Sequence, residues 1–333
     1  MQCYREYDIV HDGAFIFSFR ACGLHVSLWH RVEVQQPATR SATGCDWQKS
    51  LLLVGEWTVR RDKKAILEQI VIDMHLERTV MSILDSSAVS GCYLFPQPRC
   101  VADAFVVEVD GVKLACFQRV VNADAYTVVH FHGNGEAVAD YVPDMTDSLA
   151  SLGLNSLFVE FREYGGSTGK AQLVAMLGDG EAVVAAAGIP PGKVIAFGRS
   201  IGSLYAIELA HRQPGMAGLI IESGIADPAE RFLAYADLPA AGIDEDEVSA
   251  EVTKYFNHQQ KLTGYVGPLL IMHTENDGLI DISHAERNLN WAAGPEKRLL
   301  RFSRGDHNSI MAWNRGEYFE AIRTFAERLN GTD

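Results

Sequence analysis

The amino-acid sequence predicts an α/β fold with a doubly wound, mostly parallel sheet. From about residue 104 onward, short apolar runs alternate with helical patterns, as they do where helices connect parallel strands. A hairpin signal opens this region, because Asp110-Gly111 joins the β-rich residues 105–109 to 112–119. Hydrophobic residues make up 47% of the 333 residues, which is ample for a globular core. Together these three observations indicate one sheet with helices on both faces.

The remaining strands are expected where apolar runs are bounded by turn residues. They fall near residues 126–131, 155–161, 194–198, 218–222, 268–273 and 298–302. A helix is predicted over residues 201–212 from the spacing of its apolar residues, and another over residues 282–291, where Asp281 would be the cap. The stretch between residues 222 and 268 has room for one packing helix and a small cap at about 224–265. The acidic run Asp244-Glu245-Asp246-Glu247 is typical of a solvated helix start there.

The sequence divides into an N-terminal extension at residues 1–85 and the predicted α/β domain at 86–333. Residues 1–80 carry ten basic and ten acidic side chains, whereas the rest of the chain carries the whole net charge of −14. No period is clear from Cys3 to Ser50, and residues 63–84 have the apolar spacing of a helix. Two interpretations stay open: a small accessory extension, or a true start of the chain at Met74 or Met81.

Composition excludes several classes of protein. The acidic balance disfavours nucleic-acid binding, because phosphates would be repelled. The chain has no charged-then-apolar leader and no run of about 18 apolar residues, so neither secretion nor a membrane span is expected. The six cysteines are too sparse for a disulfide framework, which favours the reducing cytoplasm. No metal-ligand spacing or nucleotide-binding glycine pattern occurs, so no cofactor and no metal are expected.

A nucleophilic serine is predicted at Ser200. The pattern G-x-S-x-G occurs at Gly198-Arg199-Ser200-Ile201-Gly202, directly between a predicted strand and a predicted helix. That context suits a sharp turn that exposes the serine hydroxyl at the edge of a sheet. A second match surrounds Ser167, but three residues separate it from the strand before it, so Ser167 is expected in a loop. The alternative for Ser200 is a helix cap, which needs no further partners.

A nucleophilic serine needs a histidine base, and the histidine needs an acid that fixes its tautomer. Asp277 follows the strand predicted at 268–273, and His307 follows the strand predicted at 298–302. We therefore expect Ser200, Asp277 and His307 to meet at the carboxyl edge of the sheet, with Asp277 as acid and His307 as base. Asp281 and Asp306 compete for the acid role. Asp281 is interpreted instead as a helix cap, and Asp306 adjoins the histidine and so points elsewhere.

Two backbone N–H groups are needed to bind the developing oxyanion. We expect them to be those of Ile201, which follows the nucleophile, and Asn134, in the glycine-rich loop after the first parallel strand. Three other histidines, His132, His273 and His284, are interpreted as structural. Arg199, beside the nucleophile, is interpreted as a packing or ion-paired residue.

These motifs together resemble the α/β-hydrolase superfamily over about residues 90 to 330. The resemblance rests on His132-Gly133-Asn134-Gly135, Phe161-Arg162-Glu163-Tyr164-Gly165, the Ser200 pentapeptide, Asp277 and Gly305-Asp306-His307, in that order. Within the superfamily, the chain looks most like the small serine hydrolases that include protein depalmitoylases and lipid esterases. It departs from them at Phe161 and Glu163, where relatives carry tyrosine and glycine, and Cys3 stands alone where membrane-bound members carry a cysteine cluster.

The expected function is that of a serine hydrolase that cleaves carboxylic esters or thioesters through an acyl-enzyme. Its substrate would be a small or acylated molecule. Two alternatives stay open: an amidase or aminopeptidase with the same residues, and a non-catalytic ligand-binding protein on a hydrolase fold.

Overall fold

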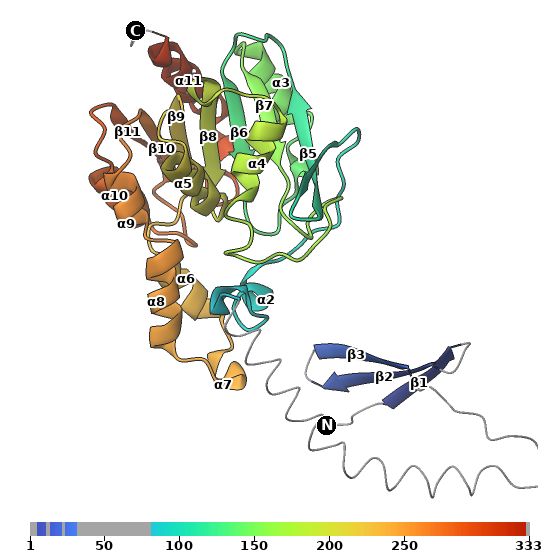
Figure 1. Cartoon of the computed structure of the whole chain (residues 1–333). Coiled ribbons are helices and arrows are strands. Elements are labelled where there is room, and N and C mark those ends of the chain that lie inside the picture. Colours follow the sequence, from blue (N-terminus) through green and yellow to red (C-terminus); the bar gives the residue numbers. More distant parts are fainter. Residues whose placement is uncertain (1–4, 11–13, 22–23, 32–80, 331–333) are drawn as a thin grey trace, which may run out of the picture. The chain divides into compact units, whose positions relative to one another are not determined.

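The computed structural model describes residues 5–10, 14–21, 24–31 and 81–330 (Figure 1). The chain divides into two compact units, Met1–Ile70 and Val71–Asp333. In the first unit, the strands β1 (Arg5–Val10), β2 (Ala14–Ala21) and β3 (Leu24–Arg31) form an antiparallel sheet in the order β1-β2-β3. Because no period is clear in this part of the sequence, the sheet was not predicted.

Most of the helix predicted at residues 63–84 lies outside the described residues. Its last four residues, 81–84, are described, and they do not continue an α-helix, so the prediction is wrong there. Ser82 has an extended backbone and begins the short 3-10 helix η1 (Ile83–Asp85). The Ser82 hydroxyl accepts a hydrogen bond from the Leu84 N–H at 3.2 Å. Serine side chains that bond nearby N–H groups in this way compete with helical hydrogen bonds and favour helix starts. The chain therefore begins a new element at Ser82.

The second unit contains an eight-stranded sheet in the order β11-β10-β9-β8-β6-β7-β5-β4. Its strands are β4 (Phe105–Val109), β5 (Val112–Arg119), β6 (Thr127–Phe131), β7 (Asn155–Val159), β8 (Val194–Arg199), β9 (Gly218–Glu222), β10 (Leu269–Thr274) and β11 (Lys297–Phe302). Strand β5 of the β4–β5 hairpin pairs antiparallel with β7, and the six strands β6 to β11 are parallel to one another. The predicted fold class is confirmed, and the strand ends lie within two residues of those predicted.

Helices cover both faces of this sheet (Figure 1). On one face lie α3 (Asp144–Ser151) and α11 (Ile310–Leu329), and on the other lie α4 (Asp179–Ala186), α5 (Gly202–Arg212) and α10 (Ile282–Trp291). A hydrophobic core lies on each face of the sheet, and alternate residues of β8 belong to one core or the other. Val194 and Ala196 pack under α5, whereas Ile195 and Phe197 pack under α11. This alternation is the period of two that a strand with both faces covered requires.

Four helices follow β9: α6 (Pro228–Tyr235), α7 (Leu238–Ala241), α8 (Glu245–Tyr255) and α9 (His258–Thr263). Helix α9 packs against α5 and α10, whereas α6, α7 and α8 form a small cap. The short helix α2 (Ser90–Tyr93) packs against α6, where the Tyr93 and Phe232 rings meet edge to face at 5.0 Å. Two further 3-10 turns, η2 (Val138–Asp140) and η3 (Pro191–Lys193), lie in connecting loops.

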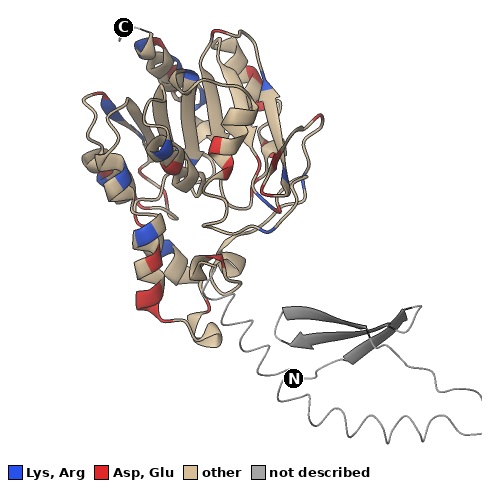
Figure 2. Cartoon of the chain, in the orientation of Figure 1, with Lys and Arg blue, Asp and Glu red and all other residues tan. Residues whose placement is uncertain are grey.

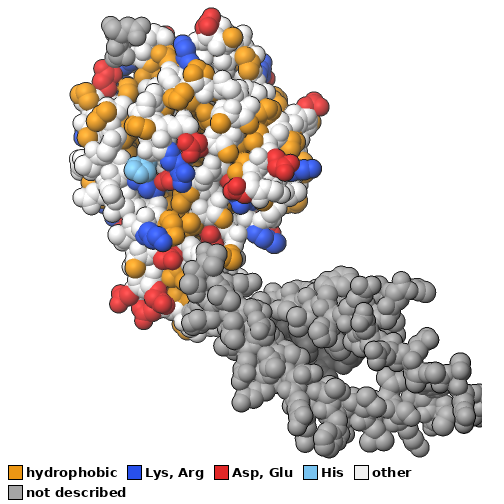
Figure 3. Space-filling model, viewed as in Figure 1, with side chains coloured by type: hydrophobic (Ala, Val, Ile, Leu, Met, Phe, Trp, Pro, Cys, Tyr) orange, Lys and Arg blue, Asp and Glu red, His pale blue; other side chains and the backbone are white. Residues whose placement is uncertain are grey.

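The acidic run in the cap starts α8, as predicted. Asp244 caps the helix, and Glu247 completes a capping box by accepting a hydrogen bond from the Asp244 N–H at 3.0 Å. Carboxylates are favourable at this end of a helix, because its N–H groups carry partial positive charge. Acidic residues gather at the outer end of the cap in Figure 2, and Figure 3 shows their side chains on the surface there. Among the described residues, no helix has both the length and the apolar character to cross a membrane.

Candidate active site

Ser200 lies on a strained turn between β8 and α5. Its φ is +52°, in the left-handed region that disfavours a residue with a side chain. A Cβ on Gly198 would lie 2.5 Å from the Gly202 carbonyl oxygen, and one on Gly202 would lie 2.1 Å from the Phe131 carbonyl oxygen. Only glycine fits at either position, so the pentapeptide is required by the close approach of strand, loop and helix. Strain of this kind clusters at functional sites.

The structure brings Ser200, His307 and Asp277 into one hydrogen-bonded set. His307 Nε2 lies 2.9 Å from Ser200 Oγ, and His307 Nδ1 lies 2.8 Å from Asp277 Oδ2. The three residues come from the carboxyl ends of β8, β10 and β11, which are parallel strands of one sheet. All three are more than 90% buried, so little water competes for these hydrogen bonds.

The Asp277 carboxylate is fixed on both oxygens. Oδ1 accepts hydrogen bonds from the Leu279 N–H at 2.9 Å and the Ile280 N–H at 2.8 Å, which leaves Oδ2 for His307. Burial raises the pKa of Asp277, but the interactions with His307 and the two backbone N–H groups outweigh it and hold the pKa below 3.8. Asp277 is therefore a carboxylate at neutral pH, oriented toward the imidazole.

The two competing aspartates are engaged elsewhere. Asp281 caps α10, and its Oδ1 accepts a hydrogen bond from the Ser283 N–H at 2.9 Å. Asp306 accepts hydrogen bonds from the Asn308 N–H at 3.1 Å and the Ser309 hydroxyl at 2.6 Å. Neither carboxylate contacts His307, in agreement with the interpretation of Asp281 as a cap and of Asp306 as directed away.

The histidines interpreted as structural each have local partners. His132 Nε2 lies 2.8 Å from Glu160, and His284 Nδ1 accepts the Ala226 N–H at 3.0 Å. His273 bonds the Ile280 carbonyl at 2.8 Å and lies 3.4 Å from Asp277 Oδ2, and burial lowers its pKa. Of these three imidazole rings, that of His273 lies beside Asp277, as a neutral neighbour of the carboxylate.

The loop after β6 lies against the turn at Ser200. A Cβ on Gly133 would lie 2.4 Å from Arg199 Nη1, so the loop and the turn are in close contact. The Asn134 side chain holds the loop in place, because it bonds the Tyr93 carbonyl at 2.6 Å and the Tyr164 hydroxyl at 2.9 Å. Within residues 81–330, the backbone N–H groups of Asn134 and Ile201 donate no hydrogen bond, so both remain available.

Arg199 is ion-paired, as interpreted, but with partners that sequence reasoning missed. It lies 2.6 Å from Glu136 and 3.3 Å from Glu222, and it donates a hydrogen bond to the His307 carbonyl at 2.8 Å. The one signal in the sequence is that Glu222, an acidic residue, ends an otherwise apolar strand run.

Ser167 lies apart from this arrangement. Its hydroxyl accepts a hydrogen bond from the Ala115 N–H of β5 at 2.9 Å. The Thr168 hydroxyl accepts the Lys113 N–H at 2.9 Å in the same way. The second G-x-S-x-G match therefore attaches a loop to the sheet. Glu163, at the position where the resemblance implies glycine, has a φ of +69°, and its carboxylate accepts a hydrogen bond from Lys170 at 2.6 Å.

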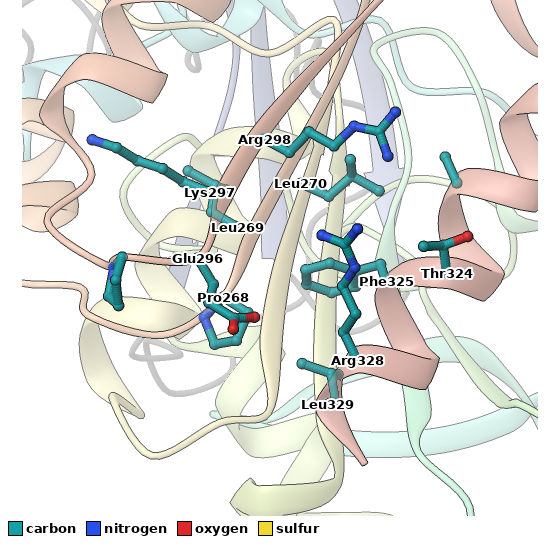
Figure 4. Close-up of a pocket in the computed structure, with 12 residues that line it drawn as sticks. Pro268, Leu269, Leu270, Glu296, Lys297, Arg298, Thr324, Phe325, Arg328 and Leu329 are labelled. Carbon is teal, nitrogen blue, oxygen red and sulfur yellow. The ribbon is translucent and has the colours of Figure 1, made fainter. Parts of the chain in front are cut away.

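A pocket of about 240 Å³ lies at the opposite edge of the sheet (Figure 4). It lies beside the amino ends of β10 and β11 and the last turns of α11, where Leu270 and Phe325 form part of its wall. Because Ser200, Asp277 and His307 follow the carboxyl ends of their strands, this pocket is separate from their site.

No model of a known protein family matches the chain. The uncharacterized protein YfhR of Escherichia coli (strain K12) is 25% identical over 199 residues, which are 58% of this chain and 66% of that protein. The human α/β hydrolase domain-containing protein 17B is 26% identical over 223 residues, which are 66% of this chain and 72% of that protein. The chain thus aligns with about two thirds of each relative.

Solved structures share the fold at lower identity. The esterase Pf2001 of Pyrococcus furiosus has a TM-score of 0.55 at 20% identity and covers 71% of this chain and 98% of its own. Est1E of Butyrivibrio proteoclasticus, with ferulic acid bound, has a TM-score of 0.57 at 17% identity and covers 69% and 100%. Taken with the relative named for an α/β-hydrolase domain, these likenesses support one conclusion: the chain has an α/β-hydrolase fold and is similar to proteins of the α/β-hydrolase superfamily.

Proposed function

We propose that this protein is a serine hydrolase that cleaves carboxylic esters or thioesters through an acyl-enzyme on Ser200. The observation that carries the proposal is the continuous set of hydrogen bonds from Ser200 Oγ through the His307 ring to Asp277. A serine that only capped a helix would not need a histidine that is itself oriented by a buried carboxylate.

In the first half of the reaction, His307 Nε2 takes the proton of Ser200 Oγ as the oxygen attacks the substrate carbonyl carbon. The Asp277 carboxylate keeps the Nδ1–H tautomer and stabilises the imidazolium that forms. His307 then donates this proton to the leaving alcohol or thiol, and the acyl group stays on Ser200. Water, activated by His307 in the same way, releases the acid in the second half.

Asn134 and Ile201 are our candidates for the oxyanion hole. Among the described residues their N–H groups donate no hydrogen bond, and the glycine contacts hold the Asn134 loop against the start of α5. Such fixed donors stabilise the transition state because they are already oriented when the negative charge develops.

Esters are the first substrates to test, because Pf2001 and Est1E are described as esterases or bound a carboxylic acid. The six cysteines remain our reason for expecting a cytoplasmic location. An amidase remains the alternative, and matched p-nitrophenyl esters and p-nitroanilides of one acid distinguish the two. Faster turnover of the anilide would favour the amidase.

The decisive experiment is labelling with a fluorophosphonate, which reacts with activated serines. The wild-type protein and Ser167→Ala should be labelled, and Ser200→Ala should not. A series of p-nitrophenyl esters of increasing acyl length then measures which acyl groups the site accepts. If Ser200→Ala still reacted covalently with the probe, Ser200 would not be the nucleophile.

A further inference from the structure

A buried ion cluster lies beside the proposed catalytic residues. Arg199 Nη1 lies 2.6 Å from Glu136, its Nε lies 3.3 Å from Glu222, and its Nη2 donates to the His307 carbonyl at 2.8 Å and to Asn308 Oδ1 at 3.3 Å. The Arg199 and Glu222 side chains are 9% and 3% exposed. The guanidinium therefore touches three separate segments of chain, and all three of its nitrogens are in use.

Both carboxylates of the cluster are themselves held. Glu136 Oε2 accepts hydrogen bonds from the Gly133 N–H at 2.6 Å and the Tyr141 hydroxyl at 2.5 Å. Glu222 Oε2 accepts one from the Tyr318 hydroxyl of α11 at 2.5 Å. The Glu222 carbonyl also accepts the Ser200 N–H at 2.8 Å. The cluster thus joins the Asn134 loop, the turn at Ser200, the end of β9 and the His307 loop.

Stability alone does not account for such a cluster. Removing charges from water costs several kcal/mol per ion, and well-packed apolar residues of similar volume often stabilise a core equally well or better. What a guanidinium adds is a planar fork with five donors in fixed directions, which a lysine ammonium does not reproduce. The fork donates a hydrogen bond to the backbone carbonyl of His307 itself. The cluster therefore fixes the position of the His307 backbone.

We infer that Arg199, anchored by Glu136 and Glu222, is a positioning residue that holds the His307 backbone so that Nε2 stays within reach of Ser200 Oγ. This inference rests on the proposed function. Because Arg199 also precedes Ser200 directly, one side chain fixes the nucleophile and the base relative to each other. A displacement of about 1 Å at reacting groups can cost about 100-fold in rate.

Arg199→Lys tests the inference, because it keeps the charge and removes the fork. We expect kcat for p-nitrophenyl butyrate to fall by about 100-fold, with KM nearly unchanged, because the substrate still binds while the proton acceptor is displaced. The rate of fluorophosphonate labelling should fall with kcat. The matched control is Arg162→Lys, which makes the same change in another buried pair, where Arg162 bonds Asp179 at 2.8 and 2.7 Å. It should lower the melting temperature and leave kcat unchanged.

If Arg199→Lys does not fold, Glu222→Gln takes its place, since glutamine keeps the shape and an oxygen for Tyr318. A lower kcat at unchanged KM supports the inference. If the wild type is labelled and active and the folded variants keep the wild-type kcat, the inference is overturned and the proposed function stands. A wild type that neither reacts with fluorophosphonate nor hydrolyses the ester would overturn both.

Discussion

Replacing Asp277 with asparagine should abolish most turnover while the fold persists. In the wild type, Oδ1 accepts two backbone N–H groups and Oδ2 accepts the His307 Nδ1–H. Asparagine has one oxygen and one NH₂ group for these two positions. Since the N–H groups of Leu279 and Ile280 both need an acceptor, the oxygen will take the Oδ1 position. The NH₂ group then faces His307 Nδ1, which must become an acceptor.

This reversal moves the imidazole proton to Nε2, where it points at Ser200 Oγ. The ring then cannot take the serine proton. In a related serine protease, the corresponding aspartate-to-asparagine change lowers kcat by about 10⁴-fold, which is roughly 5.4 kcal/mol in the activation barrier. The chain offers a matched control in Asp281→Asn, because asparagine caps a helix about as well as aspartate does. That variant should keep nearly normal turnover, with at most a slightly lower melting temperature.

The assay compares kcat for one p-nitrophenyl ester and the melting temperature of both purified variants. Circular dichroism checks that each variant is folded. We expect a loss of roughly four orders of magnitude for Asp277→Asn alone. A folded Asp277→Asn protein with more than about a tenth of the wild-type kcat would refute the tautomer argument. A loss confined to Asp281→Asn would move the acid role to Asp281.

Three further predictions follow from the packing. Gly202→Ala places a Cβ 2.1 Å from the Phe131 carbonyl oxygen and should eliminate fluorophosphonate labelling, whereas Gly215→Ala, with no atom within 4 Å, should be labelled normally. Burial lowers the pKa of His258 from 6.5 to about 3, so the unfolded chain binds the extra proton in this range. The free energy of unfolding should therefore fall as the pH drops from 6.5 toward 3, by up to about 1.4 kcal/mol per pH unit, and His258→Gln should flatten this slope in urea titrations. Deleting residues 1–70 should leave ester hydrolysis intact, because Ser200, Asp277 and His307 all lie in the second compact unit, and a soluble but inactive shortened chain would contradict this.

The sequence predicts the sheet well because strands and loops alternate regularly along this part of the chain. Parallel strands bring their carboxyl ends to one edge, so the position of Asp277 and His307 after two strand runs is enough to expect them near Ser200. Their hydrogen-bonding roles remain predictions about chemistry. The separate helices between β9 and β10 were not predicted, because short helices such as α7 and α9 leave little periodic signal in a polar stretch.

The cluster around Arg199 could not be predicted in the same way. Glu136 and Glu222 lie 86 residues apart, and a carboxylate at the end of a strand usually indicates the start of an exposed loop. Only the pairing of β6, β8 and β9 as neighbours places both acids beside one guanidinium. Residues that meet only in the folded structure in this way leave no repeating pattern in the sequence.

The cap has a consequence for how new substrate ranges can arise in this protein. Its helices α6, α7 and α8 are inserted between β9 and β10, adjacent parallel strands whose register is fixed by the sheet. Ser200, Asp277 and His307 belong to other connections. A recombination or loop exchange confined to residues 228–255 would thus replace the cap while leaving α9 and the strands that precede Ser200, Asp277 and His307 unchanged. The cap can therefore change in sequence and in length without any change to the strands that place Ser200, Asp277 and His307 side by side.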